Sequence, residues 1–190
     1  MKTRQEILQL QNRLAYLQDE AAYKALFFHF HPLLVRFVNT IVKNRDDAED
    51  VVSETLLKVW TMGRELNYVE DLSLYLFRMA RNKAVDILRK QKRDILVAAA
   101  AYDQEPGLVD ALTPERLYIT SELDHYIRTA VEALPTQSQL VFKLIKEQGF
   151  TYKQVSGILE ISQNTVETHM RLALKKIRLA LKSYLATEKK

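Results

Sequence analysis

Residues 149–178 read GFTYKQVSGILEISQNTVETHMRLALKKIR, which predicts a short helix, a tight turn and a longer helix. Gly149 is expected to end the preceding helix, Thr151 to cap the short helix and Ser162 to cap the longer one. Apolar residues recur at helical intervals and predict buried faces; they are Val155, Ile158 and Leu159, then Val166, Met170, Ala173 and Ile177. This arrangement is typical of a helix-turn-helix.

The outward positions of the longer helix carry side chains that form hydrogen bonds or bear positive charge. They are Asn164, Thr165, Thr168, His169, Arg171, Lys175 and Lys176. Such residues are expected where a helix enters the major groove and meets phosphates. Any amphipathic surface helix has a polar face, but two paired helices at this spacing in a basic chain favour contact with DNA.

The composition limits the class of protein. The chain has 190 residues, a formal net charge of +4, and only four Gly and four Pro. Long runs of Leu, Ala, Lys, Glu, Gln and Arg predict an all-α fold, of one domain or two small ones. The absence of cysteine excludes disulfides and cysteine catalysis. No signal peptide or long apolar run is evident, so we expect a cytoplasmic protein.

The charges of the N-terminal half fall into two patches. Residues 45–71 are mainly acidic, and a turn with an acidic helix N-cap is expected within residues 44–47, whereas residues 78–93 hold seven Lys/Arg against Asp86 alone. Acidic residues in a first helical turn also complement the helix dipole, so capping alone would explain part of the first patch. A cationic stripe attracts phosphates, while an acidic helix suits a basic protein surface.

Residues 1–43 show helical spacing of apolar side chains, with Leu17 among the expected core positions. Pro32 interrupts this spacing and is expected to start a new helix, because proline lacks the amide hydrogen that a helix interior requires. His29 and His31 flank the proline. No third ligand is suggested nearby, so we do not expect them to bind a metal ion.

A loop is expected at residues 63–72, between the acidic and cationic patches. Asn67 offers an amide edge and Tyr68 a stacking face to an unstacked base, although a loop tyrosine is commonly just packed. Residues 94–120 lose the helical period and predict a linker. Further helices are expected at residues 115–133 and 136–148, which lead into the helix-turn-helix.

Two separated stretches now resemble one family, in the right order. Residues 47–60 (DAEDVVSETLLKVW) and 76–89 (LFRMARNKAVDILR) resemble region 2 of bacterial RNA polymerase sigma factors, and residues 134–177 resemble region 4. A linker in place of region 3 is similar to the extracytoplasmic-function (ECF) group. The resemblance implies two small helical domains. They are region 2 at residues 1–93 and the region 4 helix-turn-helix at residues 121–190, joined by the linker at 94–120.

The resemblance also implies a role for each exposed patch. Docking on the clamp helices of the polymerase β′ subunit would use Asp50, Ser53, Glu54 and Leu57. Recognition and melting of the promoter −10 element would use Asn67, Tyr68, Arg78, Arg81, Asn82, Lys83 and Asp86. The −35 element would be read by Asn164, Thr165, Thr168, His169, Arg171 and Lys175. Further implied partners are the β flap and a membrane-anchored anti-sigma factor; no cofactor, metal or small-molecule substrate is implied.

The chain departs from the family pattern at three places. Gln137, Ser138 and Gln139 stand where many relatives have arginines, and Tyr75 stands where tryptophan is frequent. Glu167 and His169 stand where small or basic residues are frequent. Glu167 could accept a hydrogen bond from a cytosine amine or simply be solvated, and the residues do not decide between these alternatives.

Two other functions stay open on the residues alone, beside a promoter-specificity subunit without catalytic chemistry. A conventional helix-turn-helix regulator would form a homodimer on a palindromic site without polymerase. A helical nuclease would use Asp46, Asp47, Glu49 and Asp50 as metal ligands. These carboxylates crowd one helix start and lack a partner cluster elsewhere, which disfavours the nuclease.

Overall fold

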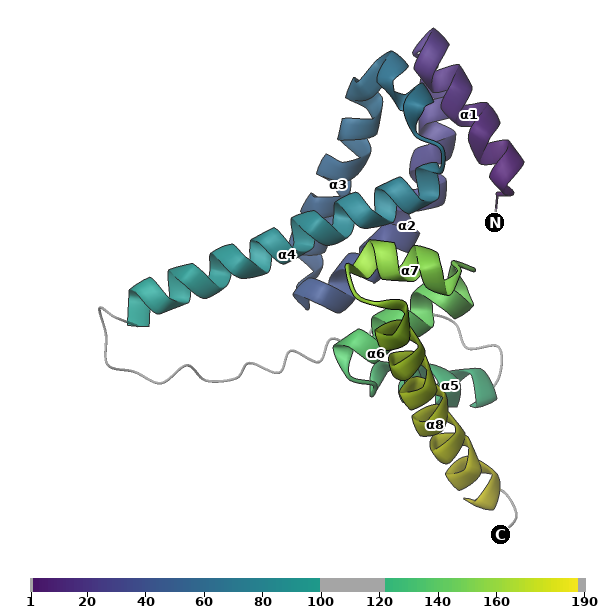
Figure 1. The fold of residues 1–190 in the computed structure, drawn as a ribbon, viewed down its shortest axis with the longest axis vertical. Coiled ribbons are helices and arrows are strands. Elements are labelled where there is room, and N and C mark those ends of the chain that lie inside the picture. Colours follow the sequence, from purple (N-terminus) through teal and green to yellow (C-terminus); the bar gives the residue numbers. More distant parts are fainter. Residues whose placement is uncertain (1, 100–121, 188–190) are drawn as a thin grey trace. The chain divides into compact units, whose positions relative to one another are not determined.

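The computed structural model describes residues 2–99 and 122–187, which form two compact units, one before and one after the intervening segment of the chain (Figure 1). All the regular structure in these described residues is helical, which confirms the predicted all-α class. The predicted domain boundaries at residues 93 and 121 stay predictions. The helix that precedes the linker continues to Ala99, and residues 100–120 of the predicted linker lie outside the described residues.

The N-terminal unit contains α1 (Arg4–Leu17), α2 (Glu20–Val42), α3 (Arg45–Met62), the short 3₁₀ helix η1 (Gly63–Tyr68) and α4 (Leu72–Ala99). Side-chain oxygens cap the α-helices at their starts, because the first amides of a helix have no partner within it. The caps are Thr3, Asp19, Asn44 and Asp71. The helix start expected within residues 44–47 is confirmed, but the cap is Asn44 rather than an acidic residue: its Oδ1 accepts hydrogen bonds from the amides of Asp46 and Asp47.

Helix α2 is central to this unit and packs against α1, α3 and α4. Phe30, Leu34 and Phe37 on α2 are buried, and Phe37 lies edge-on against Phe77 of α4 with ring centroids 5.1 Å apart. By length and composition, α2 could also cross a membrane. Core helices of helical proteins have the same composition, and the packing of α2 against three helices accounts for its apolar character.

Two expectations for residues 1–43 are wrong. Pro32 does not start a helix but lies inside α2, which is continuous from Glu20 to Val42. The missing amide hydrogen frees the carbonyl of Phe28 on the exposed side of the helix, while burial of Phe30 and Leu34 keeps the helix in place across the proline. Leu17 is exposed as the last residue of α1 and does not contribute to the core.

The C-terminal unit contains α5 (Glu122–Glu132), α6 (Thr136–Phe142), the π-helical turn η2 (Lys143–Glu147), α7 (Tyr152–Leu159) and α8 (Gln163–Thr187). Helix α8 packs against α5, α6 and α7. Val131 and Leu134, at the end of α5 and just after it, form one cluster with Ala173 and Ile177 of α8. The inward stripe of α8 therefore holds the unit together, which leaves its other face available for contacts.

Candidate nucleic-acid interface

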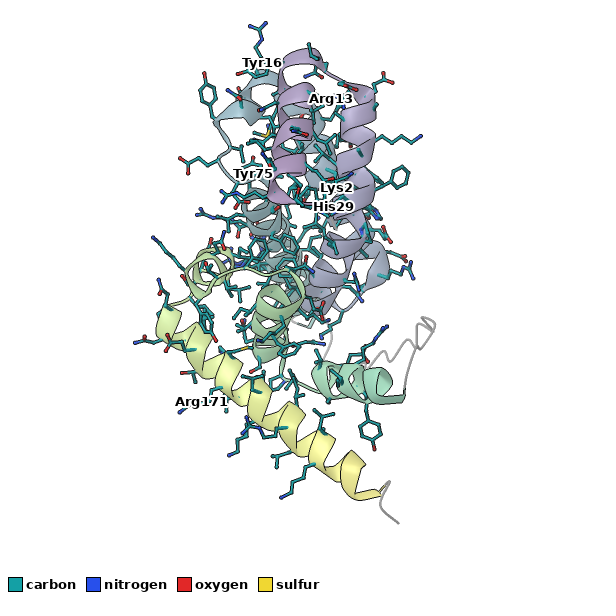
Figure 2. The ribbon with its side chains drawn as sticks, turned by 90° about the vertical axis from the view of Figure 1, so that its right-hand side faces the viewer. Lys2, Arg13, Tyr16, His29, Tyr75 and Arg171 are labelled. Atoms are coloured by element: carbon teal, nitrogen blue, oxygen red, sulfur yellow. The ribbon has the colours of Figure 1, made fainter. Side chains whose placement is uncertain are left out.

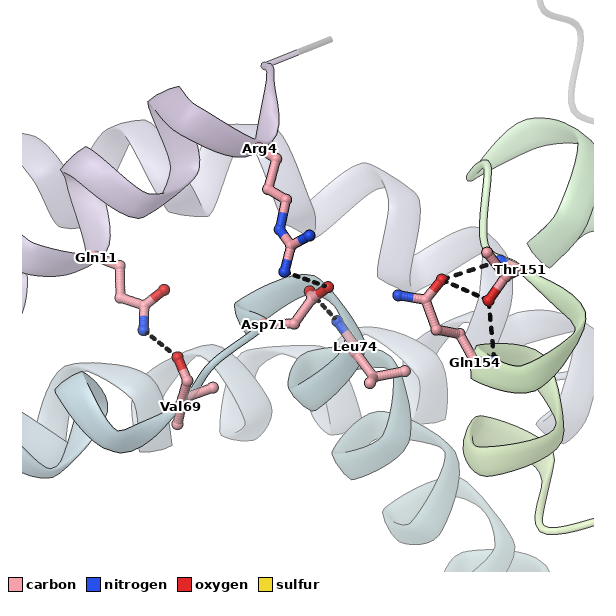
Figure 3. Close-up of polar contacts among 7 residues, drawn as sticks. All are labelled: Arg4, Gln11, Val69, Asp71, Leu74, Thr151 and Gln154. Atoms are coloured by element: carbon pink, nitrogen blue, oxygen red, sulfur yellow. Dashed lines mark hydrogen bonds and ion pairs between the residues drawn. The ribbon is translucent and has the colours of Figure 1, made fainter.

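The local structure of the helix-turn-helix confirms the predicted caps. Gly149 follows the π-helical turn with φ +75°, a conformation that glycine adopts without strain. Thr151 and Gln154 form a reciprocal capping box, with the Gln154 amide donating to Thr151 Oγ1 (3.3 Å) and the Thr151 amide donating to Gln154 Oε1 (3.0 Å) (Figure 3). At the start of α8, Ser162 Oγ accepts from the Thr165 amide at 3.1 Å. These bonds set where α7 and α8 begin.

The predicted buried faces are also confirmed. Val155, Ile158 and Leu159 of α7 are buried, as are Val166, Met170, Ala173 and Ile177 of α8. Because helical residues three and four apart share a face, burial of this stripe turns the polar positions of α8 outward. Asn164, Thr168, Arg171, Lys175 and Lys176 are all exposed, and Figure 2 marks Arg171 on α8.

Three of the predicted −35 residues have hydroxyl or ring atoms that already form hydrogen bonds. Thr165 Oγ1 lies 2.7 Å from Ser162 Oγ, and Thr168 Oγ1 donates to the Asn164 carbonyl at 2.9 Å. His169 Nδ1 lies 3.1 Å from Ser138 Oγ on α6. One edge of the imidazole is therefore bound within the protein, which links α8 to α6.

The departures after Leu134-Pro135 have a structural explanation. Ser138 and Gln139 are buried in α6, whereas Gln137 is exposed. A buried position cannot contact phosphate, and Ser138 instead forms a hydrogen bond with His169 of α8. Gln139 Oε1 is the one buried side-chain polar atom that lacks a hydrogen-bond partner among the described residues.

A shallow groove of about 390 Å³ runs between the start of α7 and the outward face of α8. Its lining combines apolar, acidic and cationic side chains; they are Tyr152, Glu167, Met170, Arg171, Leu174, Lys175, Arg178 and Leu179. Glu167 therefore lies beside the predicted base-reading residue Arg171. Both interpretations of Glu167, as a base acceptor and as a solvated carboxylate, remain compatible with this position.

The predicted polymerase-docking residues lie on one exposed face of α3. Asp50, Ser53, Glu54 and Leu57 are all exposed, and Leu57 adds an apolar side chain to the acidic face. Glu54 Oε2 also accepts a hydrogen bond from Lys83 Nζ of α4 at 2.5 Å. The predicted docking face and the predicted −10 face are therefore joined by an ion pair, which the sequence did not indicate.

The other predicted −10 residues of α4 lie on its outer side to different degrees. Arg78 is exposed, while Arg81 is half-buried and donates to Asn82 Oδ1 at 2.9 Å. Asp86 is exposed and pairs with Arg89 at 3.2 Å. Tyr75 (labelled in Figure 2), in the position where tryptophan is frequent, is half-buried. Its hydroxyl donates to Met62 Sδ at 3.5 Å. Its side chain is thus anchored against the end of α3.

The segment at residues 63–72 presents Asn67 and Tyr68 to solvent. Its first part is η1 rather than an irregular loop, and Leu66 is completely buried, whereas Tyr68 is 86% exposed. Gln11 of α1 donates through Nε2 to the carbonyl of Leu66 at 2.8 Å. The same nitrogen donates to the carbonyl of Val69 at 2.7 Å (Figure 3). The sequence reasoning missed Gln11. The available signal was a polar residue at an inward position of α1, between Ile7 and Leu14.

The two histidines of α2 have ordinary structural partners. His31 Nε2 lies 2.9 Å from Glu49 Oε2, and its ring stacks on Phe27 with centroids 4.9 Å apart. Burial lowers the pKa of His29, and the nearby positive charge of Lys2 adds to this effect. Within the part of the chain that the structure describes, no group of three or more His, Asp or Glu side chains is arranged to hold a metal ion.

The chain combines a helix-turn-helix unit with a second helical unit that has adjacent acidic and cationic faces. This combination is typical of DNA-binding transcription proteins. The family profile described as Sigma-70 region 2 matches residues 26–94, and the profile described as Sigma-70, region 4 matches residues 124–177. Together they cover most of the chain, which belongs to the sigma-70 family of RNA polymerase sigma factors, in its ECF group. As a sigma factor, it directs promoter-specific transcription initiation by core RNA polymerase.

Relatives support the same assignment along most of the chain. The ECF sigma-E factor of Haemophilus influenzae is 28% identical over 144 residues, with 73% of this chain and 74% of the relative covered. The ECF sigma factor SigX of Bacillus subtilis is 24% identical, with 84% and 83% covered. The fold is similar to that of the sigma factor RpoE from Bartonella quintana, solved in complex with the anti-sigma factor NepR. That comparison has a TM-score of 0.63 at 24% identity and covers 84% of this chain and 96% of RpoE.

Proposed function

We propose that α3 docks on the β′ clamp helices of the polymerase through Asp50, Ser53, Glu54 and Leu57. The observation that carries this assignment is that the four side chains are exposed together on one face of a helix whose opposite face is fully packed. Carboxylates with one apolar neighbour suit a basic protein surface that has an apolar contact at its centre. Docking would bring the cationic side of α4, which packs against α3, to the promoter.

The N-terminal unit then captures the −10 element. Extracting a base from the stack costs a few kcal/mol, and stacking on an aromatic side chain returns about 1–3 kcal/mol per base. Tyr68 is the exposed aromatic residue that can supply this energy, with the Asn67 amide beside it for a base edge. Side chains of α4 hold the strand that flanks the base; they are Arg78, Arg81, Asn82, Lys83 and Asp86.

The C-terminal unit reads the −35 element with the outward face of α8. We assign Arg171 to a base edge and Lys175 to a phosphate, because both are exposed on this face. Asn164 and Thr168 are exposed near the N-terminal end of the helix, where base contacts are usual. Thr165 and His169 contribute with the atoms not already bonded to Ser162 and Ser138. Neither unit needs to bind DNA tightly alone, because polymerase makes the second contact intramolecular.

The remaining partners follow from the same assignment. The protein acts in the cytoplasm, where polymerase and promoters are, and it needs no catalytic group, cofactor or metal ion of its own. The β flap is the expected second contact with polymerase. RpoE from Bartonella quintana was solved with an anti-sigma factor. An anti-sigma factor, anchored in the membrane, would inhibit the present protein by covering the face that α3 offers to polymerase.

The test is assembly followed by transcription. The purified chain is mixed with active core RNA polymerase from its own source, separated by size-exclusion chromatography, and used to transcribe a library of genomic fragments. Co-elution and new defined start sites are expected, and the start sites would reveal both promoter elements. Failure to co-elute, together with a free homodimer that binds a palindromic site, would instead support a conventional helix-turn-helix regulator.

A further inference from the structure

Helix α1 lies before residue 26, where the match to region 2 begins, yet it packs directly against η1. Its inward face carries Ile7, Leu14 and Ala15, which are apolar, and Gln11, whose residue is only 2% exposed. A buried glutamine on an apolar face loses its bonds to water and must regain them inside the protein. The hydrogen-bond partners of Gln11 therefore indicate the role of this side chain.

The side-chain amide of Gln11 donates two hydrogen bonds, both to the backbone of residues 63–72, the predicted base-capture segment. Nε2 donates one N–H to the Leu66 carbonyl at 2.8 Å and the other to the Val69 carbonyl at 2.7 Å. These bonds set the orientation of the amide, because a rotated amide would place its oxygen against two carbonyl oxygens. A single side chain thus holds the backbone immediately before Asn67 and immediately after Tyr68.

These two hydrogen bonds to the backbone matter because Tyr68 has little packing of its own. Tyr68 is 86% exposed, so the direction in which its side chain points depends on the backbone of residues 66–69. The Val69 amide also donates to the Leu66 carbonyl at 3.2 Å, which closes the turn that Gln11 bridges. A segment held in its binding conformation loses less entropy when a base is captured than a segment that must first be ordered.

We propose that Gln11 is a positioning residue for promoter melting, which holds the segment with Asn67 and Tyr68 in the conformation that accepts an extruded base. The inference rests on the proposed −10 role of that segment. It assigns to α1, an element outside the matched region 2, a part in the recognition of single-stranded DNA.

The test compares Gln11→Met with Gln9→Met in reconstituted holoenzyme. Both changes replace a glutamine of α1 by methionine, but Gln9 is exposed and serves as the matched control. Promoters found by the transcription assay carry 2-aminopurine at successive positions of the −10 element, so that fluorescence reports base extrusion. Gln11→Met is expected to reduce the equilibrium constant for capture about tenfold, since the Leu66 and Val69 carbonyls both lose the hydrogen bond from Gln11. Core binding and contact with the −35 element should be unchanged.

A double-mutant cycle with Tyr68→Ala separates positioning from general loss of stability. If Gln11 acts through Tyr68, then Gln11→Met should cost little further capture once Tyr68 is removed. Gln11→Asn keeps both N–H donors on a shorter side chain and should give an intermediate effect; it is used if Gln11→Met melts near the assay temperature. Additive losses in the cycle, or equal capture by the Gln11→Met and Gln9→Met holoenzymes, would overturn the inference.

The outcome also distinguishes this inference from the function on which it rests. A wild-type chain that forms no holoenzyme or extrudes no base would refute the proposed function itself. A wild-type holoenzyme that extrudes a base normally, with no dependence on Gln11, would refute only the positioning role.

Discussion

Reversal of the charge at Glu54 separates a docking role from a structural one. The Glu54 side chain is 67% exposed and that of its partner Lys83 is 37% exposed. Exposed ion pairs contribute only about 0–1 kcal/mol to stability, because solvent screens the charges. Glu54→Arg should therefore lower the unfolding free energy of the N-terminal unit by no more than about 1 kcal/mol. The fold should persist, and any large effect must come from binding.

The expected effect on polymerase binding is much larger. Loss of one partner of a desolvated, hydrogen-bonded charge pair at an interface costs about 2–5 kcal/mol. At 1.4 kcal/mol per factor of ten, this corresponds to a dissociation constant raised about 30-fold to a few thousand-fold. The assay is fluorescence anisotropy of labelled protein titrated with core polymerase, with thermal melting of the free protein followed by circular dichroism.

Two further variants make the result decisive. Glu65→Arg reverses an exposed charge on η1, outside the four proposed docking residues, and should bind core normally. The double variant Glu54→Lys with Lys83→Glu keeps opposite charges across α3 and α4 but reverses the charge on the docking face, so it should still fail to bind. Normal binding by Glu54→Arg would refute the proposed surface. Restored binding in the charge-swapped variant would show that the ion pair itself, rather than the face, is required.

Three other predictions concern DNA reading and stability. Arg171→Ala should lose about 1–3 kcal/mol of DNA-binding free energy selectively at promoters with the preferred −35 element, whereas Lys175→Ala should weaken binding to all sequences and reduce by about one the slope of log binding constant against log salt concentration. Binding of the holoenzyme to −35 variants over a salt series tests both, and a uniform loss for Arg171→Ala would contradict the groove assignment. Thr151→Ala breaks the capping box and should lower the unfolding free energy of the C-terminal unit by about 1 kcal/mol, as measured by urea denaturation. The control is Thr168→Ala, whose hydroxyl bonds only within one exposed turn, and an equal loss of unfolding free energy in this variant would argue against a capping effect. Because burial lowers the pKa of His29, this histidine binds a proton more readily in the unfolded protein than in the folded one, so its contribution to the unfolding free energy should be fully present above the ordinary pKa of 6.5 and fall as the pH drops below it. The variant His29→Gln should reduce the dependence of the melting temperature on pH in this range, and an unchanged dependence would mean that other groups cause it.

Local sequence signals were sufficient for most helices. The caps at Thr151 and Ser162 are correct because each depends on a side chain and amides within three residues of it. The buried stripe of α8 is correct for a similar reason, since a period of 3.6 residues places its members on one face whatever they pack against. Pro32 shows the limit of such signals. Its preference for a helix start is a local property, but packing of the residues on both sides of it extends α2 through the proline.

The tertiary structure alone decided which side chains meet across the helices. Gln11 reaches the carbonyls of Leu66 and Val69, 55 and 58 residues away, and Glu54 reaches Lys83, 29 residues away. In the sequence, each appears as one more polar residue on a helix, because nothing within a few positions names its partner. Helix packing sets these distances, and it depends on how all the apolar faces of a unit fit together at once. Sequence therefore identified the faces and the family, whereas the fold revealed how α1 supports the segment that presents Tyr68.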